Sequence, residues 1–247
     1  MGGGGLFSIL AIGSRFGIKG ILIALLVIGG MTFAGPCSHA TQRVSDRSAP
    51  ATGTAQDDPM VHFVGFVLDD VQKTWHAQLP DYTNAKLVLF RDSIGSACGT
   101  ATEAVGPFYC PNDKKVYIDL AFYDELRTKL GAPGDFAQAY VIAHELGHHI
   151  QDIRGLLGQG GASSVPIELQ ADCLAGAWAK DAEKRGELQV GDIDEALNAA
   201  SQIGDDTLEK KAGQQVQPER WTHGSAAQRS GSFNKGYAGG APACGIN

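Results

Sequence analysis

Two short segments constrain the fold of this chain more than any other feature. Residues 144–148 read His-Glu-Leu-Gly-His, and residues 168–172 read Glu-Leu-Gln-Ala-Asp. On a helix, His144 and His148 project from one face, so both imidazoles can reach a single metal ion. Glu168 can supply a third, oxygen ligand if a second helix faces the first. The chain must therefore fold so that two helices meet at this point.

Two further carboxylates in these segments have positions that suit the chemistry of a metal site. Glu145 lies one residue round the helix, near the metal but not bound to it, where a general base for a metal-activated water must be. Three protein ligands leave the fourth position of a tetrahedral zinc ion open for that water. Asp172 lies one turn after Glu168 and can accept the second ring N–H of a ligand histidine. The pattern predicts one Zn2+ per chain; the alternative is a helix whose histidines are surface residues.

Both segments have the apolar spacing of amphipathic helices. The first helix is predicted to begin with a capping box, Asp135-x-x-Gln138, and to stop at Gly155. Its apolar stripe consists of Ala139, Ile142, Ala143, Leu146, Ile150 and Ile153. The second helix is predicted to begin near Ser164, with Pro166 in its first turn. Its stripe consists of Ile167, Ala171, Leu174, Ala175 and Trp178.

The remaining patterns predict an α+β fold over residues 59–247, mainly helical with a small β-sheet. Strands are expected over residues 86–90 and 116–120. The second strand is interpreted either as a core strand or as an edge strand that pairs with an extended substrate backbone. Further helices are expected over residues 60–75, 121–130, 192–203 and 224–237.

Residues 1–35 differ in character from the rest of the chain. Arg15 and Lys19 accompany a largely apolar stretch, and residues 18–34 are predicted to cross a membrane once, as an anchor with a cytoplasmic N-terminus. The alternative is a signal peptide cleaved after Ser38-His-Ala40, which would give a secreted protein. Residues 36–58 are rich in small and polar residues and predict a flexible linker. Either interpretation places the remaining domain outside the cytoplasm, in a periplasmic or extracellular position.

The five cysteines agree with an oxidising compartment. Cys98 and Cys110 bracket a short loop that suits a local disulfide. Cys173 and Cys244 could then join the second metal-site helix to the C-terminus, which leaves Cys37 over. The sequence alone does not fix these pairs, and the alternative is a protein with five reduced thiols.

The charge balance excludes one class of partner. The chain has 20 Lys and Arg residues against 27 Asp and Glu residues, a net charge of −7 at pH 7. Such an acidic chain does not offer the basic surface that nucleic acids need. The predicted partners are therefore a peptide or protein substrate and, through residues 18–34, a membrane.

Several motifs between residues 98 and 225 belong together: Cys98-Gly-Thr-Ala, Gly106-Pro-Phe-Tyr-Cys110-Pro, Val116-Tyr-Ile-Asp-Leu, Val141-Ile-Ala-His-Glu-Leu-Gly-His-His-Ile-Gln151, Glu168-Leu-Gln-Ala-Asp-Cys-Leu-Ala-Gly176 and Thr222-His-Gly-Ser225. Together they resemble the neutral zinc metallopeptidase family of bacteria, whose members have an N-terminal membrane segment. The metal site is also similar to that of thermolysin-type enzymes, the gluzincins. This resemblance implies a zincin-like domain with zinc held by His144, His148 and Glu168, Glu145 as the base and Asp172 behind a ligand histidine. The C-terminus departs from the family pattern because Ser230-Gly-Ser and Gly239-Gly-Ala are rich in small residues.

The function predicted from these observations is that of a zinc metalloendopeptidase, a hydrolase that cuts peptide bonds with a zinc-activated water and Glu145 as general base. The oxyanion of the tetrahedral intermediate needs a hydrogen-bond donor besides the metal. His223 is the candidate, with Tyr140 and His149 as further candidates. Two alternatives stay open: a zinc amidase acting on a non-protein substrate, and a membrane-tethered scaffold or chaperone that binds metal without catalysis.

Overall fold

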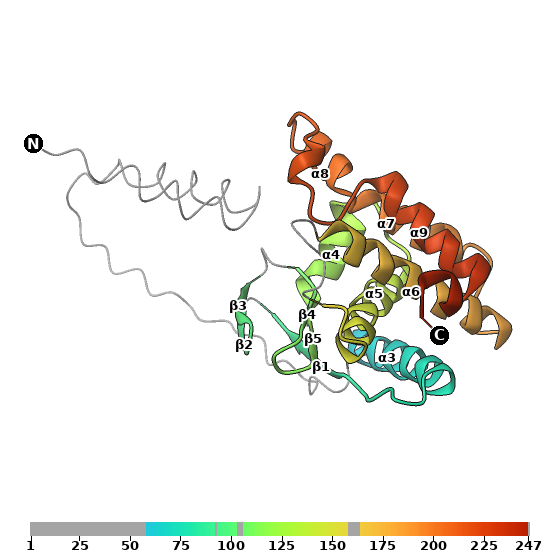
Figure 1. The fold of residues 1–247 in the computed structure, drawn as a ribbon. Coiled ribbons are helices and arrows are strands. Elements are labelled where there is room, and N and C mark those ends of the chain that lie inside the picture. The colour runs from blue at the N-terminus through green and yellow to red at the C-terminus, as the bar shows by residue number, and fades with distance from the viewer. Residues whose placement is uncertain (1–57, 92, 103–105, 158–163, 247) are drawn as a thin grey trace, which may run out of the picture. The chain divides into compact units, whose positions relative to one another are not determined.

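The amphipathic segments pack around a shared hydrophobic core in the computed structural model, which describes residues 58–91, 93–102, 106–157 and 164–246 (Figure 1). The predicted membrane segment, residues 18–34, and nearly all of the predicted linker lie outside these ranges. Within the ranges, none of the helices combines the length and apolar character needed to span a bilayer. The described part is mostly helical with a small sheet, in agreement with the predicted α+β class.

Helix α3 (Pro59–Gln78) forms one wall of the core, where the sequence predicts an amphipathic helix. The Asp58 carboxylate caps its N-terminus by accepting a hydrogen bond from the Met60 N–H at 2.9 Å. Pro59 needs no such acceptor because it has no N–H. The buried stripe of this helix packs toward helices α5 and α6 and consists of Val64, Val67, Val71 and Trp75.

A three-stranded sheet lies beside the helices, with strand order β1-β5-β4 (Figure 1). Its strands are β1 (Lys86–Phe90), β4 (Phe108–Cys110) and β5 (Lys115–Asp119). Strand β5 pairs in parallel with β1 and antiparallel with β4, so residues 115–117 are hydrogen-bonded on both sides. The core-strand interpretation is confirmed for residues 116–119, which are buried, while Leu120 begins a helix. The edge-strand interpretation is wrong for residues 116–117, which pair on both sides, and stays a prediction for residues 118–119, which pair with β1 alone among the described residues.

Some short elements were not predicted from the sequence. Strands β2 (Ser93–Ser96) and β3 (Gly99–Thr102) form a separate antiparallel hairpin. Helix α8 (Asp205–Lys211) and the 3-10 helices η3 (Pro218–Arg220) and η4 (Ala241–Cys244) were missed as well. The longer helices α4 (Leu120–Thr128), α7 (Asp192–Gln202) and α9 (Ala226–Gly239) lie within two residues of their predicted bounds.

Helix α5 (Asp135–Ile153) carries the first metal-site segment and has its predicted apolar stripe in the core. The predicted capping box is wrong, because the N-cap residue is Gly134 and it makes no side-chain cap. The Glu195 carboxylate of α7 instead accepts a hydrogen bond from the Phe136 N–H at 3.1 Å. A Cβ on Gly134 would overlap that carboxylate, so the glycine makes room for a cap supplied by another helix.

Helix α6 (Val165–Lys184) carries the second metal-site segment and begins where it was predicted to begin, with Pro166 in its first turn. Its backbone lies unusually close to that of α9. A Cβ on Gly176 of α6 would overlap the Phe233 carbonyl, and a Cβ on Gly236 of α9 would overlap the Cys173 carbonyl. The small residues of the C-terminal part therefore permit two helices to approach backbone to backbone.

Both suggested cysteine pairs are present as disulfides. Cys98 bonds to Cys110 with their Cα atoms 5.8 Å apart, and Cys173 bonds to Cys244 with their Cα atoms 5.6 Å apart. The first disulfide ties the β2–β3 turn to the end of β4, and the second ties α6 to η4. Cys37 lies outside the described residues.

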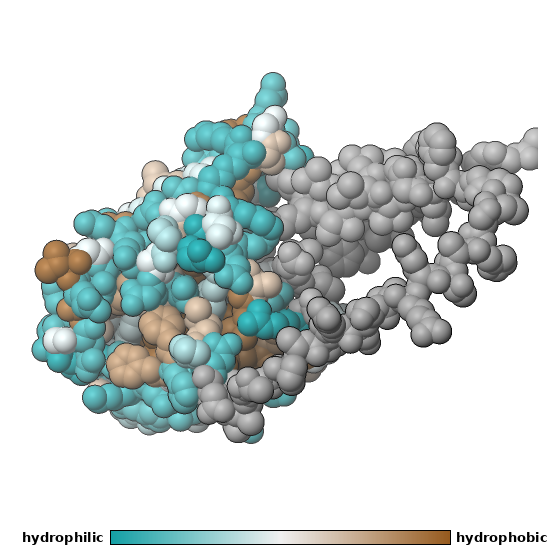
Figure 2. Space-filling view, turned by 180° about the vertical axis from the view of Figure 1, so that it is seen from behind, coloured by the Kyte–Doolittle hydropathy of each residue, from teal (hydrophilic) through white to brown (hydrophobic). Residues whose placement is uncertain are grey.

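The face of the described part seen in Figure 2 is mainly hydrophilic, with separate apolar patches. Large hydrophobic side chains that stay exposed among the described residues are Phe66, Val190 and Val216. Exposed apolar residues scattered in this way are normal for a globular protein. The described part therefore has a buried apolar core and only scattered large apolar side chains at its surface.

The contact between α6 and α9 can be tested with two alanine substitutions on α9. We expect Gly236→Ala to lower the free energy of unfolding by about 1–3 kcal/mol or more, because the added methyl group pushes against the α6 backbone. Gly231→Ala is the matched control: no atom lies within 4 Å of a Cβ there, so better helix propensity should raise stability by up to about 1 kcal/mol. Urea denaturation followed by circular dichroism measures both. Equal stability of the two variants would contradict the close approach of the helices.

Candidate metal centre

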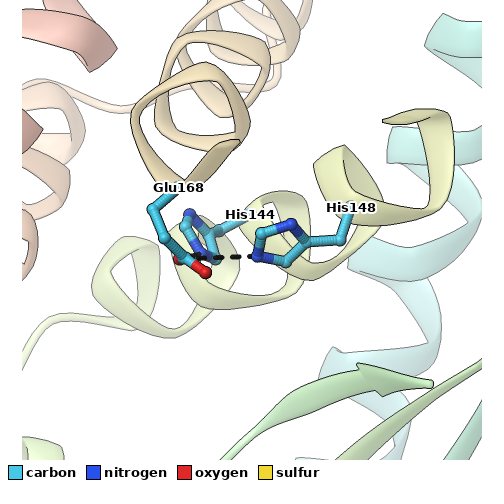
Figure 3. Close-up of side chains that lie close together, drawn as sticks. All are labelled: His144, His148 and Glu168. Atoms are coloured by element: carbon cyan, nitrogen blue, oxygen red, sulfur yellow. Dashed lines mark hydrogen bonds and ion pairs between the residues drawn. The ribbon is translucent and has the colours of Figure 1, made fainter. Parts of the chain in front are cut away.

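The predicted ligands come together where α5 meets the first turn of α6 (Figure 3). His144 and His148 project from one face of α5, with ring centroids 4.8 Å apart and ring planes nearly perpendicular. Glu168 of α6 places its Oε2 atom 3.2 Å from His144 Nε2 and 3.5 Å from His148 Nε2. One ligand atom from each of the three residues lies within 4.8 Å of the other two.

These separations fit a zinc ion. Zinc binds imidazole nitrogen and carboxylate oxygen at about 2.0–2.2 Å, which places neighbouring ligand atoms of a tetrahedron about 3.3–3.5 Å apart. The two Nε2–Oε2 distances, 3.2 Å and 3.5 Å, are close to that edge length. Two imidazoles and one carboxylate are also a ligand set typical of catalytic zinc. The chemistry and the spacing of this group therefore agree with zinc.

Close packing of the two helices sets the distance between the ligands. Gly147 lies between the two histidines on α5, and a Cβ there would be only 3.0 Å from the Ala171 Cα atom on α6. A larger side chain at either position would separate the helices and move Glu168 away from the imidazoles. Gly147 and Ala171 thus allow a carboxylate on one helix to reach nitrogens on the other.

The Nδ1 atom of His144, on the side of the ring away from Glu168, faces a buried group of polar side chains. Asp172 Oδ1 accepts a hydrogen bond from His144 Nδ1 at 2.7 Å, as the spacing predicted, and accepts another from the Tyr140 hydroxyl at 2.5 Å. Arg229 of α9 donates to both Asp172 oxygens, at 2.9 and 3.0 Å, and to the Tyr140 oxygen. Because its Nδ1 is the donor to a carboxylate, His144 presents Nε2 toward Glu168.

The Nδ1 atom of His148 has a different partner, which sequence reasoning did not identify. Its Nδ1 lies 2.8 Å from Gln151 Oε1, an acceptor, so His148 also presents Nε2 toward Glu168. The Gln151 amide donates to the Ile167 carbonyl at 2.7 Å and to Gln170 Oε1 at 2.9 Å. Both ligand histidines are therefore fixed in the same tautomer and orientation by groups behind them.

The electrostatics of the centre favour a cation. Burial alone would lower the pKa of His144, but the charge of Asp172 and hydrogen bonds to Asp172 and Glu168 outweigh burial and raise it to about 10. The pKa of His148 is also raised, since the hydrogen bond to Glu168 outweighs burial. Burial opposes ionisation of Glu168, yet its hydrogen bonds to both histidines hold its pKa far below the ordinary value. The negative charge that attracts protons to the Nε2 atoms attracts a metal ion to the same place.

Glu145 is buried beside the ligands without being one of them. Its side chain is 6% exposed, and its charge helps to raise the pKa of His148. The pKa of Tyr123 in α4 is raised as well, mainly by burial and to a smaller extent by the Glu145 charge. The Tyr123 hydroxyl is buried and has no hydrogen-bond partner among the described residues. Glu145 is thus a buried carboxylate whose charge acts on a ligand histidine and on Tyr123, a buried residue that sequence reasoning missed.

The three candidates for the oxyanion donor have different surroundings. His223 lies in the loop before α9, with its side chain 48% exposed, and its backbone N–H donates to Asp205 at 2.7 Å. The same loop reaches the start of α6, where the Ser164 hydroxyl donates to the Thr222 carbonyl at 2.5 Å. Tyr140 and His149 are fully buried. Tyr140 donates to Asp172, and the ring nitrogens of His149 lie 2.6 Å from the Thr83 carbonyl and 3.0 Å from the Tyr109 hydroxyl.

Comparison with known proteins shows the family to which the chain belongs. The family model described as "Putative neutral zinc metallopeptidase" matches residues 1–245, so the chain belongs to this family. The chain is 41% identical over 241 residues to the uncharacterized protein YpfJ of Escherichia coli K12, which covers 90% of this chain and 83% of that protein. It is 44% identical over 192 residues to the uncharacterized protein Rv2575 of Mycobacterium tuberculosis H37Rv, which covers 70% of this chain and 66% of that protein. No solved structure matches the chain.

The ligand assignment predicts the metal content of simple variants. We expect the purified protein to contain close to one zinc per chain, and His144→Ala/His148→Ala to contain almost none because two of three ligands are lost. His149→Ala is the matched control, since this neighbouring buried histidine bonds to Thr83 and Tyr109 and should leave the zinc content unchanged. Elemental analysis after dialysis measures all three proteins. Full zinc content in the double variant would show that the ligands lie elsewhere.

Proposed function

We propose that this protein is a zinc-dependent metallopeptidase that hydrolyses peptide bonds with Glu145 as general base. The observation that carries the proposal is a group of three ligands with an uncoordinated, buried carboxylate beside it. Among the described residues, the ligand group contains His144, His148 and Glu168 and no fourth member. Structural zinc sites use four protein ligands, whereas catalytic sites use three and leave one position open.

Zinc held by His144, His148 and Glu168 would act as a Lewis acid and would lower the pKa of a nearby water to about 7. The residues of the chain do the remaining work. Glu145 takes the proton of the attacking water and passes it to the leaving amine. Asp172 and Gln151 hold the ligand imidazoles in one tautomer, so the geometry is fixed before substrate binds. The low exposure of Glu145 strengthens its interactions with the reacting groups.

We propose His223 as the hydrogen-bond donor to the oxyanion of the tetrahedral intermediate. Its loop is held in place by Asp205, whose carboxylate accepts hydrogen bonds from the backbone N–H groups of Thr222, His223 and Gly224. The loop also contacts the first turn of α6, the turn that carries Glu168. A half-exposed imidazole in a fixed loop can face both solvent and substrate.

The role of Glu145 predicts a separation of metal binding from turnover. We expect Glu145→Gln to keep its zinc and to hydrolyse peptides about 10²–10⁴-fold more slowly, because an amide cannot accept the proton. Digestion of a peptide library by the full-length protein, with products identified by mass spectrometry, measures this. His223→Ala in the same assay should lower kcat with unchanged zinc content, and an unchanged kcat would make His223 structural.

The control for this experiment is Glu125→Gln on the surface of α4. The Glu125 carboxylate pairs with Lys129 at 2.8 Å, so its loss should leave turnover as it is. Peptide hydrolysis by Glu145→Gln at the wild-type rate would eliminate Glu145 as the base. Zinc binding without cleavage of any library peptide by the wild-type protein would instead favour an amidase with a non-protein substrate or a non-catalytic scaffold.

We propose further that residues 18–34 attach the protein to a membrane and that residues 59–247 lie outside the cytoplasm. Two observations support this: the apolar segment follows basic residues, and two disulfides lie in the described part. Disulfides persist in oxidising compartments and are rare in the cytosol.

This location predicts the behaviour of reporter fusions in bacterial cells. A phosphatase that needs its own disulfides for activity should be active when it is fused after Asn247, because the fusion point then lies in an oxidising compartment. The matched fusion lacks residues 1–35 and should be inactive. Phosphatase activity is measured in intact cells with a chromogenic substrate. Equal activity of both fusions would contradict the proposed role of the N-terminal segment.

A further inference from the structure

We infer that the C-terminal segment, residues 226–246, is an integral part of the metal centre because it holds both ligand histidines in place. The segment contains α9 and η4, neither of which supplies a metal ligand. Two separate hydrogen-bond chains nevertheless connect it to His144 and to His148. The inference rests on the zinc site of the proposed function and does not depend on which substrate is cut.

The first chain runs from α9 to His144. The Arg229 guanidinium is only 3% exposed, and it donates from Nε to Asp172 Oδ2 at 2.9 Å and from an NH2 group to Asp172 Oδ1 at 3.0 Å. Asp172 Oδ1 is the atom that accepts the His144 Nδ1–H. Arg229 also donates to the Ile203 carbonyl at 3.2 Å, which fixes the guanidinium from its other side. The orientation of the carboxylate behind His144 is thus set by a side chain from α9.

The second chain runs from η4 to His148. The backbone carbonyl of Cys244 accepts a hydrogen bond from Gln170 Nε2 at 2.9 Å. This bond directs Gln170 Oε1 toward Gln151, whose amide donates to it at 2.9 Å. The Gln151 amide is thereby turned so that its Oε1 atom faces His148 Nδ1 at 2.8 Å. Because an amide has distinct donor and acceptor ends, each bond in the chain fixes the orientation of the next.

The Cys173–Cys244 disulfide joins the two chains covalently. Cys173 directly follows Asp172, the acceptor of the first chain, and Cys244 supplies the carbonyl at the end of the second. The backbone contacts at Gly176 and Gly236 lie next to this disulfide, because Gly236 of α9 approaches the Cys173 carbonyl of α6. The disulfide therefore holds the C-terminal segment at the distance that both hydrogen-bond chains require.

Removing a group that hydrogen-bonds to a metal ligand lowers the metal affinity about 10–100-fold. Arg229 also brings a positive charge near the site, which on its own would disfavour a cation. We expect the loss of orientation to outweigh the loss of this charge. Without Arg229, the fully buried Asp172 carboxylate is left with two fewer hydrogen bonds to a charged partner and can no longer hold its position.

The test is zinc affinity, measured on the full-length protein by competition with a chromophoric chelator. We expect Arg229→Met and Cys173→Ser/Cys244→Ser to bind zinc about 10–100-fold more weakly. Two variants are matched controls. Arg185→Met removes another arginine that pairs with a buried aspartate, Asp70, and Cys98→Ser/Cys110→Ser removes the other disulfide. Both controls should bind zinc within about threefold of wild type, since neither contacts the ligands or their partners.

A second readout reports on ligand geometry directly. Cobalt(II) in place of zinc has visible absorption bands that depend on the arrangement of its ligands. We expect altered bands in Arg229→Met, wild-type bands in Arg185→Met and recovery toward wild type in Arg229→Lys, which restores a donor to Asp172. The absorption of Glu145→Gln should match wild type, so failure of the hydrolytic mechanism and failure of this inference give different results.

Gln170→Leu decides the case if the other variants do not fold. Gln170 is half-buried, and its replacement removes only the hydrogen bonds to Gln151 and Cys244. We expect a zinc affinity about tenfold lower with a nearly unchanged melting temperature. Wild-type zinc affinity in Gln170→Leu would overturn the inference, and so would wild-type affinity in a folded Arg229→Met protein.

Discussion

The buried carboxylate of Asp172 joins the three helices that build the metal centre. It belongs to α6, accepts hydrogen bonds from Tyr140 and His144 of α5, and pairs with Arg229 of α9. An ionised group with no exposure to water is costly unless every oxygen is paired, and removing one partner of a buried ion pair costs about 3–5 kcal/mol. The helices therefore cannot separate without leaving this charge unpaired. One group thus sets the packing of the helices and the orientation of a metal ligand.

The sequence was most informative where local geometry decides the outcome. His144 and His148 share a face of α5 because the helical repeat places residues four apart on one side, whatever the rest of the fold does. Gln151 lies three residues after His148, so the same repeat could have identified it. Arg229 could not be found in this way, since its contact with Asp172 spans 57 residues and depends on how α9 packs. Partners that come from distant segments leave no periodic signal.

A similar distinction explains the fold. Helices α4, α7 and α9 were located within two residues of their predicted bounds because burial repeats along them, whereas α3 ends three residues beyond its predicted range. The capping box at Asp135 was wrong because a carboxylate from α7 reaches the helix start, and the glycine that permits it is informative only when the contact is known. The glycines at positions 176 and 236 pose the same problem. Their positions in the sequence do not show that they meet, and in the structure they are the condition for a backbone contact between α6 and α9.

In the proposed mechanism, the groups that hold the ligand histidines in place are different from the group that takes up the proton. The groups behind the imidazoles, Asp172 and Gln151, occupy each Nδ1 atom and direct each Nε2 atom to the side of Glu168. Glu145 and Tyr123 are buried as well, and the Glu145 charge helps to raise the pKa of both His148 and Tyr123. Catalytic groups need positions accurate to about 0.5 Å, which long side chains reach only when other contacts restrict them. Extending that restriction to the C-terminal segment gives the ligand side chains rigidity, and it leaves Glu145, the base of the proposed mechanism, outside both hydrogen-bond chains.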